Sequence, residues 1–203
     1  IKPMLAYSAV AHTGSLMVGL VSLPGSEYAA TAMVFYLVAY SIMTVGAFSV
    51  LIPLAKRGDR GFDLTDFAGL GYREPFLAFA LSIFLLSMAG VPPTAGFLGK
   101  YHLFSAAVEA GEVPLAVLGV ISSVISVYYY LRVLVYLYMK EAPSLERRAE
   151  VWSGAWFVTL VSLFFTLQLG ILPGNLFTIR RFKTNPPYFS IRTDNRIKHL
   201  KAA

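Results

Sequence analysis

The chain has 203 residues, of which 57% are hydrophobic and only 14% are charged. A soluble domain usually carries about 25% charged residues, and several apolar runs here are long enough to cross a bilayer. Composition therefore excludes an ordinary soluble domain and predicts an all-α fold, a polytopic transmembrane helical bundle. The chain has no cysteine, which excludes disulfides, thiolate metal sites and iron–sulfur ligation on the chain itself.

The net charge of +6 comes from one end of the chain. Residues 1–179 contain ten Lys/Arg and ten Asp/Glu, whereas residues 180–203 contain seven Lys/Arg and one Asp. We therefore expect a membrane domain over residues 1–175 and a basic tail over 176–203 that is disordered or non-native. No basic face with the pattern of a nucleic-acid-binding domain is visible, so no nucleic-acid partner is expected.

Five hydrophobic regions predict about five membrane segments. The first two cover about 4–22 and 29–54, and the last two cover about 115–139 and 152–172. The third region, about 75–108, is too long for a single crossing. Its 34 residues would extend about 51 Å as a helix, against a hydrocarbon core of about 30 Å.

The third segment is predicted to be broken at Gly90–Pro93. Pro92 and Pro93 each remove an amide donor, and the second proline disfavours helical geometry at the first. Unpaired backbone cannot face lipid, so the break must be buried in protein or line a wet cavity. Broken helices recur at the ion sites of transporters.

Lys100 follows this break and is the first candidate site residue. It lies nine residues before Glu109, which places it about 13 Å from that end of the membrane segment. A lysine at such depth costs at least about 2.5–3.5 kcal/mol on insertion scales. The alternative is snorkelling to the interface, which suits the last turn of a helix better than this position. We therefore favour a functional lysine.

His12 in the first segment is the second candidate. Ser8 lies one helical turn before it and can share its face. Two interpretations remain open: a neutral histidine hydrogen-bonded within the bundle, or an element of a proton relay, since histidine titrates close to physiological pH. His102 is interpreted as packing or interfacial, and Arg132 as snorkelling toward the interface beside anchoring tyrosines.

The short loops indicate the orientation of the bundle. The connections on the side of Lys2 carry several Lys and Arg, whereas the two turns on the other side carry only Glu27, Glu109 and Glu112. The positive-inside rule places the side of Lys2 in the cytoplasm or its organellar equivalent. The chain begins without an initiator Met or a recognisable signal peptide, and we expect its start to lie within a longer protein.

Four stretches carry a resemblance to a known family. They read IKPMLAYSAVAHTG, DFAGLG, SMAGVPPTAGFLGKYHLF and SVYYYLRVLVYLYM. Together they resemble the antiporter-like subunits of proton-pumping NADH–quinone oxidoreductase (respiratory complex I), and within these the subunit N family, the equivalent of mitochondrial subunit 2. The first stretch alone would fit the wider superfamily, which includes multi-subunit cation/proton antiporters. Tyr101 and His102 depart mildly from the family pattern, and the tail departs from it more.

The resemblance implies a fold, a function and a site. The chain would be a C-terminal portion, helices ten to fourteen of fourteen, in a bacterial inner membrane or an energy-transducing organelle membrane. It would be a proton-translocating subunit within an oxidoreductase, with Lys100 and His12 as its proton-transfer residues. Partners would be the other membrane subunits of complex I and the lipid bilayer, and quinone only indirectly. NADH, FMN, iron–sulfur clusters and quinone would belong to partner subunits, and no metal or cofactor is expected on this chain.

Two other functions remain open at this point. One is a subunit of a multi-subunit cation/proton antiporter, against which the YYYLR stretch argues. The other is a purely structural membrane subunit. A scaffold has no need of a buried lysine, so Lys100 is the residue that separates the structural alternative from transport.

Overall fold

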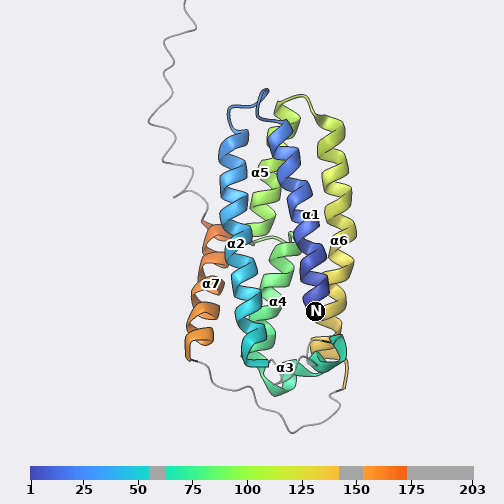
Figure 1. The fold of residues 1–203 in the computed structure, drawn as a ribbon, viewed down its shortest axis with the longest axis vertical. Coiled ribbons are helices and arrows are strands. Elements are labelled where there is room, and N and C mark those ends of the chain that lie inside the picture. Colours follow the sequence, from blue (N-terminus) through green and yellow to red (C-terminus); the bar gives the residue numbers. More distant parts are fainter. Residues whose placement is uncertain (55–62, 142–152, 173–203) are drawn as a thin grey trace, which may run out of the picture. The chain divides into compact units, whose positions relative to one another are not determined.

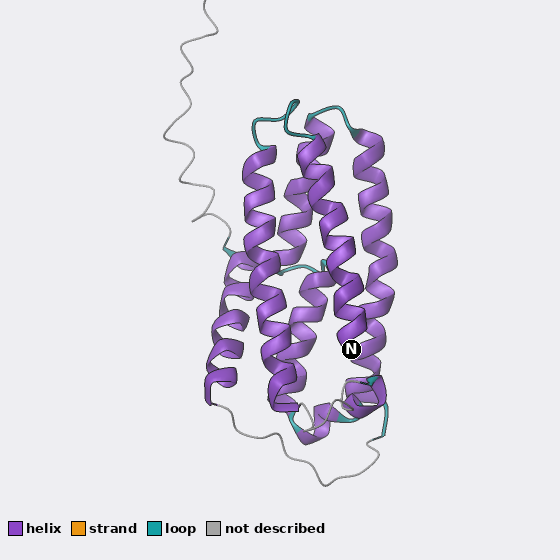
Figure 2. Cartoon of the chain, in the orientation of Figure 1, coloured by secondary structure: helices purple, strands orange, loops and turns teal. Residues whose placement is uncertain are grey.

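The computed structural model describes residues 1–54, 63–141 and 153–172, and every element within these ranges is a helix (Figure 2). The predicted all-α bundle is confirmed. In chain order the elements are α1 (Lys2–Val21), α2 (Ala29–Leu54), the 3-10 helix η1 (Leu64–Phe67), α3 (Leu70–Arg73), α4 (Pro75–Ala89), α5 (Ala95–Glu109), α6 (Val113–Met139) and α7 (Ser153–Ile171) (Figure 1).

Four of these helices, α1, α2, α6 and α7, are long and apolar enough to cross a membrane, and α4 is a shorter apolar helix. The third predicted segment is two helices rather than one. α4 and α5 follow each other along the bundle, and the loop between them lies at mid-height (Figure 1). The predicted break is therefore confirmed. Gly90 caps α4 with φ 90°, a left-handed conformation that favours glycine.

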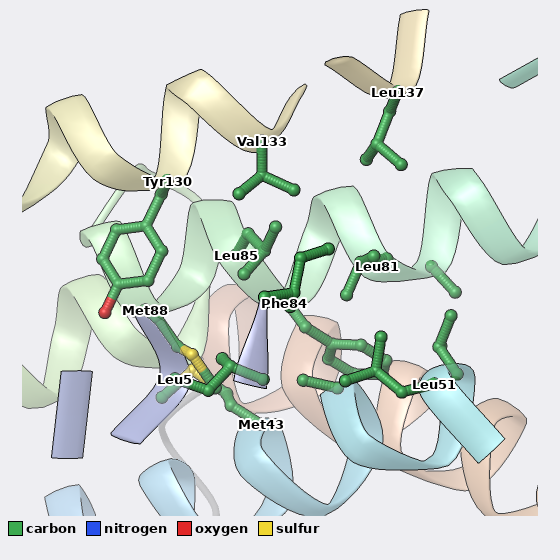
Figure 3. Close-up of a cluster of buried hydrophobic side chains, with 14 of the residues drawn as sticks. Leu5, Met43, Leu51, Leu81, Phe84, Leu85, Met88, Tyr130, Val133 and Leu137 are labelled. Atoms are coloured by element: carbon green, nitrogen blue, oxygen red, sulfur yellow. The ribbon is translucent and has the colours of Figure 1, made fainter. Parts of the chain in front are cut away.

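α2 is the central helix of the bundle, because it packs against α1, α4, α5 and α7. α6 covers the opposite side of α4. Figure 3 shows Val133 and Leu137 of α6 directed toward Leu81 and Leu85 of α4. All four side chains are at most 1% exposed. The apolar core therefore lies around α4, and the break that follows α4 borders this core.

The two ends of the bundle match the predicted loop sides. The turns after α1 and after α5 lie at one end, whereas the N-terminus and α3 lie at the other (Figure 1). The two turns are close, since a Cβ on Gly25 would lie 2.8 Å from the Cα of Ala110. Cytoplasmic placement of the other end stays a prediction. The basic residues at 56–60 and 147–148, and the predicted tail at 176–203, lie outside the described residues.

The connection between α2 and α4 contains structure that the sequence did not predict. η1 and α3 are only four residues each, too short to show a hydrophobic period. The Gly69 amide donates to the Tyr136 carbonyl at 3.1 Å, and the Arg73 guanidinium donates to the Ala68 carbonyl at 2.9 Å. The first bond holds the connection against α6, and the second stabilises the connection itself.

Candidate functional site

Lys100 is buried at the break, with 7% of its surface exposed. Its Nζ donates to the carbonyl oxygens of Met88 at 3.0 Å and Ala89 at 3.3 Å. These are the last two residues of α4. The C-terminus of a helix carries partial negative charge, and a cation there is stabilised. The snorkelling alternative is wrong for this structure, because the side chain reaches inward to the break.

The two preceding carbonyls of α4 are satisfied by backbone amides. The Gly90 amide donates to the carbonyls of Leu86 and Ser87, and the Val91 amide also donates to Leu86, each at 3.0 Å. This is the hydrogen-bond pattern of a Schellman motif. With Lys100 on the last two carbonyls, all four terminal carbonyls of α4 have a donor. α4 can thus end in the middle of the bundle without an unpaired terminal carbonyl.

The start of α5 is held against the end of α4 by Ser87. The Gly96 amide donates to Ser87 Oγ at 3.1 Å, and Ser87 Oγ donates to Met43 Sδ of α2 at 2.7 Å. Gly96 is required for this approach, because a Cβ there would lie 1.9 Å from the Ser87 carbonyl oxygen. Thr94 Oγ1 donates to the Val91 carbonyl at 2.6 Å and closes the loop. The position of Lys100 one turn later is therefore fixed by packing.

His12 lies in a cage of three tyrosines and is 3% exposed. Its Nδ1 is 2.6 Å from the hydroxyl of Tyr36 on α2. Its Nε2 is 3.4 Å from the hydroxyl of Tyr130 on α6. The ring of Tyr40 packs on the imidazole with centroids 4.4 Å apart and planes tilted by 31°. Both ring nitrogens thus have a hydroxyl partner, so the histidine is a hydrogen-bonded group within the bundle.

Ser8 shares the face of His12, as its spacing predicts. Ser8 Oγ lies 2.5 Å from the Tyr130 hydroxyl, and that hydroxyl also contacts His12. Figure 3 shows Tyr130 at the edge of the apolar cluster, with its oxygen pointing away from the apolar side chains. The prediction that the YYY tyrosines anchor at an interface is wrong for this one, since Tyr130 is 2% exposed whereas Tyr128 and Tyr129 are 66% and 54% exposed.

The surroundings of Lys100 and His12 meet at Tyr36. Gly99 directly precedes Lys100, and a Cβ on it would lie 2.6 Å from Tyr36 Cδ2. The same tyrosine places its hydroxyl on His12. α5 can approach α2 this closely only because position 99 has no side chain. Tyr36 therefore contacts both His12 and the residue that precedes Lys100.

A cleft of about 760 Å³ lies beside Lys100. Ala89, Gly90 and Lys100 line it at the break, and a row of aliphatic side chains on α6 lines it opposite: Val117, Val120, Ile121, Val124 and Val127. Val127 is one helical turn from Tyr130. Lys100 thus lines an apolar cleft, while its amine donates to the end of α4.

His102 and Arg132 have other surroundings than Lys100 and His12. His102 Nδ1 hydrogen-bonds the Tyr28 hydroxyl, and its ring packs edge-on against Phe35 with centroids 5.9 Å apart. Burial raises the pKa of the Tyr28 hydroxyl, in the turn before α2, to about 12, so Tyr28 is neutral at physiological pH. The His102 ring is therefore packed against the aromatic rings of Tyr28 and Phe35, and its role stays a prediction. Arg132 is exposed on α6, which agrees with an outward-facing side chain.

Sequence reasoning missed the tyrosines that surround His12. Tyr36 and Tyr40 are spaced i, i+4 on α2, a signal for a shared face, but an aromatic pair in an apolar helix is usually core. Tyr130 is the third of three consecutive tyrosines. Helical geometry turns three consecutive residues to different directions, so one of them could face inward, but only the packing of α6 decides which.

Comparison with known proteins identifies the family. The family model described as NADH:quinone oxidoreductase/Mrp antiporter, TM, matches residues 1–126. The chain belongs to this family. The family covers both transport functions that the sequence left open. The predicted antiporter-like resemblance is therefore confirmed.

Curated relatives within the family carry one recurring name. The chain is 44% identical over 173 residues to NADH-quinone oxidoreductase subunit N of Trichlorobacter lovleyi, covering 85% of this chain and 35% of that protein. It is 47% identical over 176 residues to subunit N 1 of Sorangium cellulosum, again covering 85% and 35%. The chain thus spans about a third of the length of these relatives.

A solved structure shows the same fold. A chain of respiratory complex I from Thermus thermophilus with bound Aureothin matches with a TM-score of 0.72 and 33% identity, covering 86% of this chain and 38% of that one. The helices of the described residues and the bacterial relatives together make this chain a multi-pass protein of a bacterial inner membrane. An organellar membrane, the other predicted location, is not supported by these relatives.

Proposed function

We propose that this chain is part of subunit N of proton-pumping NADH–quinone oxidoreductase and that Lys100 and His12 transfer protons within it. The observation that carries the proposal is the buried Lys100 ammonium at the C-terminal carbonyls of a broken helix. The naming of the curated relatives as subunit N supports complex I over a cation/proton antiporter.

The partners of Lys100 suit a group that gains and loses a proton. They are two carbonyl oxygens, which are dipoles rather than charges. When the ammonium releases a proton, the neutral amine still has N–H groups to donate to them, and no buried carboxylate loses its counter-ion. A lysine is suited to this exchange because its ammonium can give up a proton, whereas an arginine keeps its proton.

The role within the larger enzyme follows from the family. Electron transfer from NADH to quinone would take place on partner subunits, which would hold NADH, FMN, the iron–sulfur clusters and quinone. Their redox energy would drive proton movement through this membrane subunit. The partners of this chain would be the neighbouring membrane subunits of complex I and the lipid bilayer.

We also propose that the chain corresponds to helices ten to fourteen of the subunit, its C-terminal portion. A match toward the N-terminal part of the relatives is the alternative. The upstream coding sequence separates the two. Nine further membrane segments carrying a buried Glu and two Lys support our placement, and fewer than nine contradict it.

The proton-transfer role is tested by substituting Lys100 in the complete subunit. Lys100→Met keeps an apolar stem beside the cleft but removes the amine, and it should abolish most NADH-driven proton uptake by reconstituted vesicles. Lys100→Arg keeps a cation on the α4 carbonyls, so the complex should assemble, but proton uptake should not be restored. Lys140→Ala, at an exposed lysine after α6, is the matched control and should pump normally.

The Arg variant separates proton transfer from a structural cap. If Lys100 only neutralises the end of α4, then Lys100→Arg should assemble and pump like the wild type. Wild-type proton uptake by either Lys100→Met or Lys100→Arg, at normal assembly, would contradict the proposal and favour a scaffold role.

A further inference from the structure

A hydrogen-bonded chain of four side chains crosses the bundle at His12. It runs from Ser8 Oγ to the Tyr130 hydroxyl at 2.5 Å, on to His12 Nε2 at 3.4 Å, and from His12 Nδ1 to the Tyr36 hydroxyl at 2.6 Å. The four residues are between 0% and 8% exposed. They come from α1, α2 and α6, so the chain connects three helices through one imidazole.

We infer that the hydroxyls of Tyr130 and Tyr36 form a proton relay through His12. Nothing in the family match or in the names of the relatives assigns a role to these tyrosines. The inference rests on the proposed function, because a relay has a use only in a proton-translocating subunit. It goes further by naming the two groups through which a proton enters and leaves the imidazole.

The chemistry of the three groups permits the relay. A neutral imidazole has one N–H donor and one acceptor nitrogen, and a phenol can donate and accept at once. A proton that reaches the Tyr130 oxygen releases that hydroxyl's own proton to Nε2 of His12. Nδ1 then gives its proton to the Tyr36 oxygen, and the Tyr36 hydroxyl passes its own proton to the hydroxyl of Ser15, its side-chain hydrogen-bond partner on α1. One proton enters and one leaves, and a turn of the imidazole and the hydroxyls restores the starting state.

The packing holds the relay in register. The ring of Tyr40 lies on the imidazole at a centroid distance of 4.4 Å and limits its tilt. Gly99 lies against the Tyr36 ring, which fixes that phenol between His12 and the residue that precedes Lys100. The contact from Tyr130 to Nε2 is at the long end of hydrogen-bond distances, because the same hydroxyl is held closely by Ser8. Transfer between Tyr130 and His12 is therefore the step that limits the relay.

The consecutive tyrosines of α6 supply a matched test. Tyr130→Phe removes one oxygen from the buried ring, whereas Tyr129→Phe removes the same atom from an exposed ring on the same helix. Both are introduced into the complete subunit, and NADH-driven proton uptake is measured in vesicles with the assembled complex. We expect the rate of proton uptake to fall at least about tenfold in Tyr130→Phe, which is less than the full rate enhancement that a positioned proton-transfer group contributes. In Tyr129→Phe the rate should stay at the wild-type value.

A solvent isotope effect distinguishes a relay from a structural hydroxyl. If proton transfer has become the slow step, uptake by Tyr130→Phe in D₂O should slow more than uptake by the wild type does. A purely structural loss would lower the rate without changing the isotope effect. Tyr36→Phe removes the hydroxyl at the other ring nitrogen, and we expect the same lower uptake and larger isotope effect. If Tyr130→Phe does not assemble, the result for Tyr36→Phe tests the relay.

The outcomes also separate this inference from the proposed function. If Tyr130→Phe and Tyr36→Phe pump like Tyr129→Phe while Lys100→Met does not pump, the relay is wrong and the proposed function stands. If Lys100→Met pumps normally as well, the proposed function fails together with the inference.

Discussion

Gly99 packs so closely against Tyr36 that a single added carbon would lie 2.6 Å from the ring. This contact joins the two halves of the candidate site, since Gly99 precedes Lys100 and Tyr36 binds His12. The position of Lys100 along α5 and the position of the His12 cage on α2 therefore depend on each other. A change at this one contact should be felt by both predicted proton-transfer residues.

Gly99→Ala tests that dependence. The added methyl must displace the Tyr36 ring or push α5 away from α2, and overpacking of this kind costs about 1–3 kcal/mol. We expect a lower melting temperature of the assembled complex and slower proton uptake. Gly14→Ala on α1 is the control, because a Cβ there has nothing within 4 Å. Equal behaviour of the two variants would show that the contact is not tight in the complete subunit.

Gly96→Ala should be more severe. The added carbon would lie 1.9 Å from the Ser87 carbonyl oxygen, and backbone at a helix end cannot move aside as a flexible side chain can. We expect the free energy of unfolding to fall by more than about 3 kcal/mol, as it does when core packing is disrupted. Little of the variant subunit should then be present in the membrane. The amount of assembled complex on a native gel measures this. Gly154→Ala, in open space on α7, should assemble at the wild-type level.

Thr159→Val tests whether a buried polar pair outside the candidate site affects stability without affecting proton uptake. Thr159 Oγ1 lies 2.8 Å from Ser49 Oγ and joins α7 to α2. Within the described residues, the hydrogen bonds of this pair do not include His12 or Lys100. Hydrogen bonds between membrane helices contribute about 0.6 kcal/mol on average. We expect a small decrease in the melting temperature of the complex and unchanged proton uptake. A loss of pumping without a loss of stability would mean that this pair also belongs to the proton path.

Deletion of residues 176–203 tests the predicted tail. The composition of this segment, strongly basic and less apolar than the rest of the chain, predicts that it contributes no packing to the bundle. Removing it from the complete subunit should leave assembly and proton uptake unchanged. If the truncated subunit fails to assemble, the segment is a docking element and the prediction is wrong.

The sequence by itself determined the class of fold and most of its helix boundaries. Apolar runs of membrane length defined α1, α2, α6 and α7 because each nearly uniform run must be helical in lipid. The double proline at 92–93 predicted the break for a local reason, namely two missing amide donors. Lys100 was predicted as a site residue from its cost in hydrocarbon and its place just after the break. Each of these inferences depends on the residue and its neighbours along the chain, not on tertiary contacts.

Only the tertiary structure decided what these residues touch. The sequence places Lys100 eleven and twelve residues from Ala89 and Met88, and nothing in that spacing shows that the amine turns back to cap α4. Tyr130 lies 118 residues from His12, and its two neighbouring tyrosines are chemically identical. Which of the three faces the imidazole depends on the rotation of α6 against α1 and α2. That rotation is set by side-chain packing over the whole length of the helices, a property that no local stretch of sequence contains.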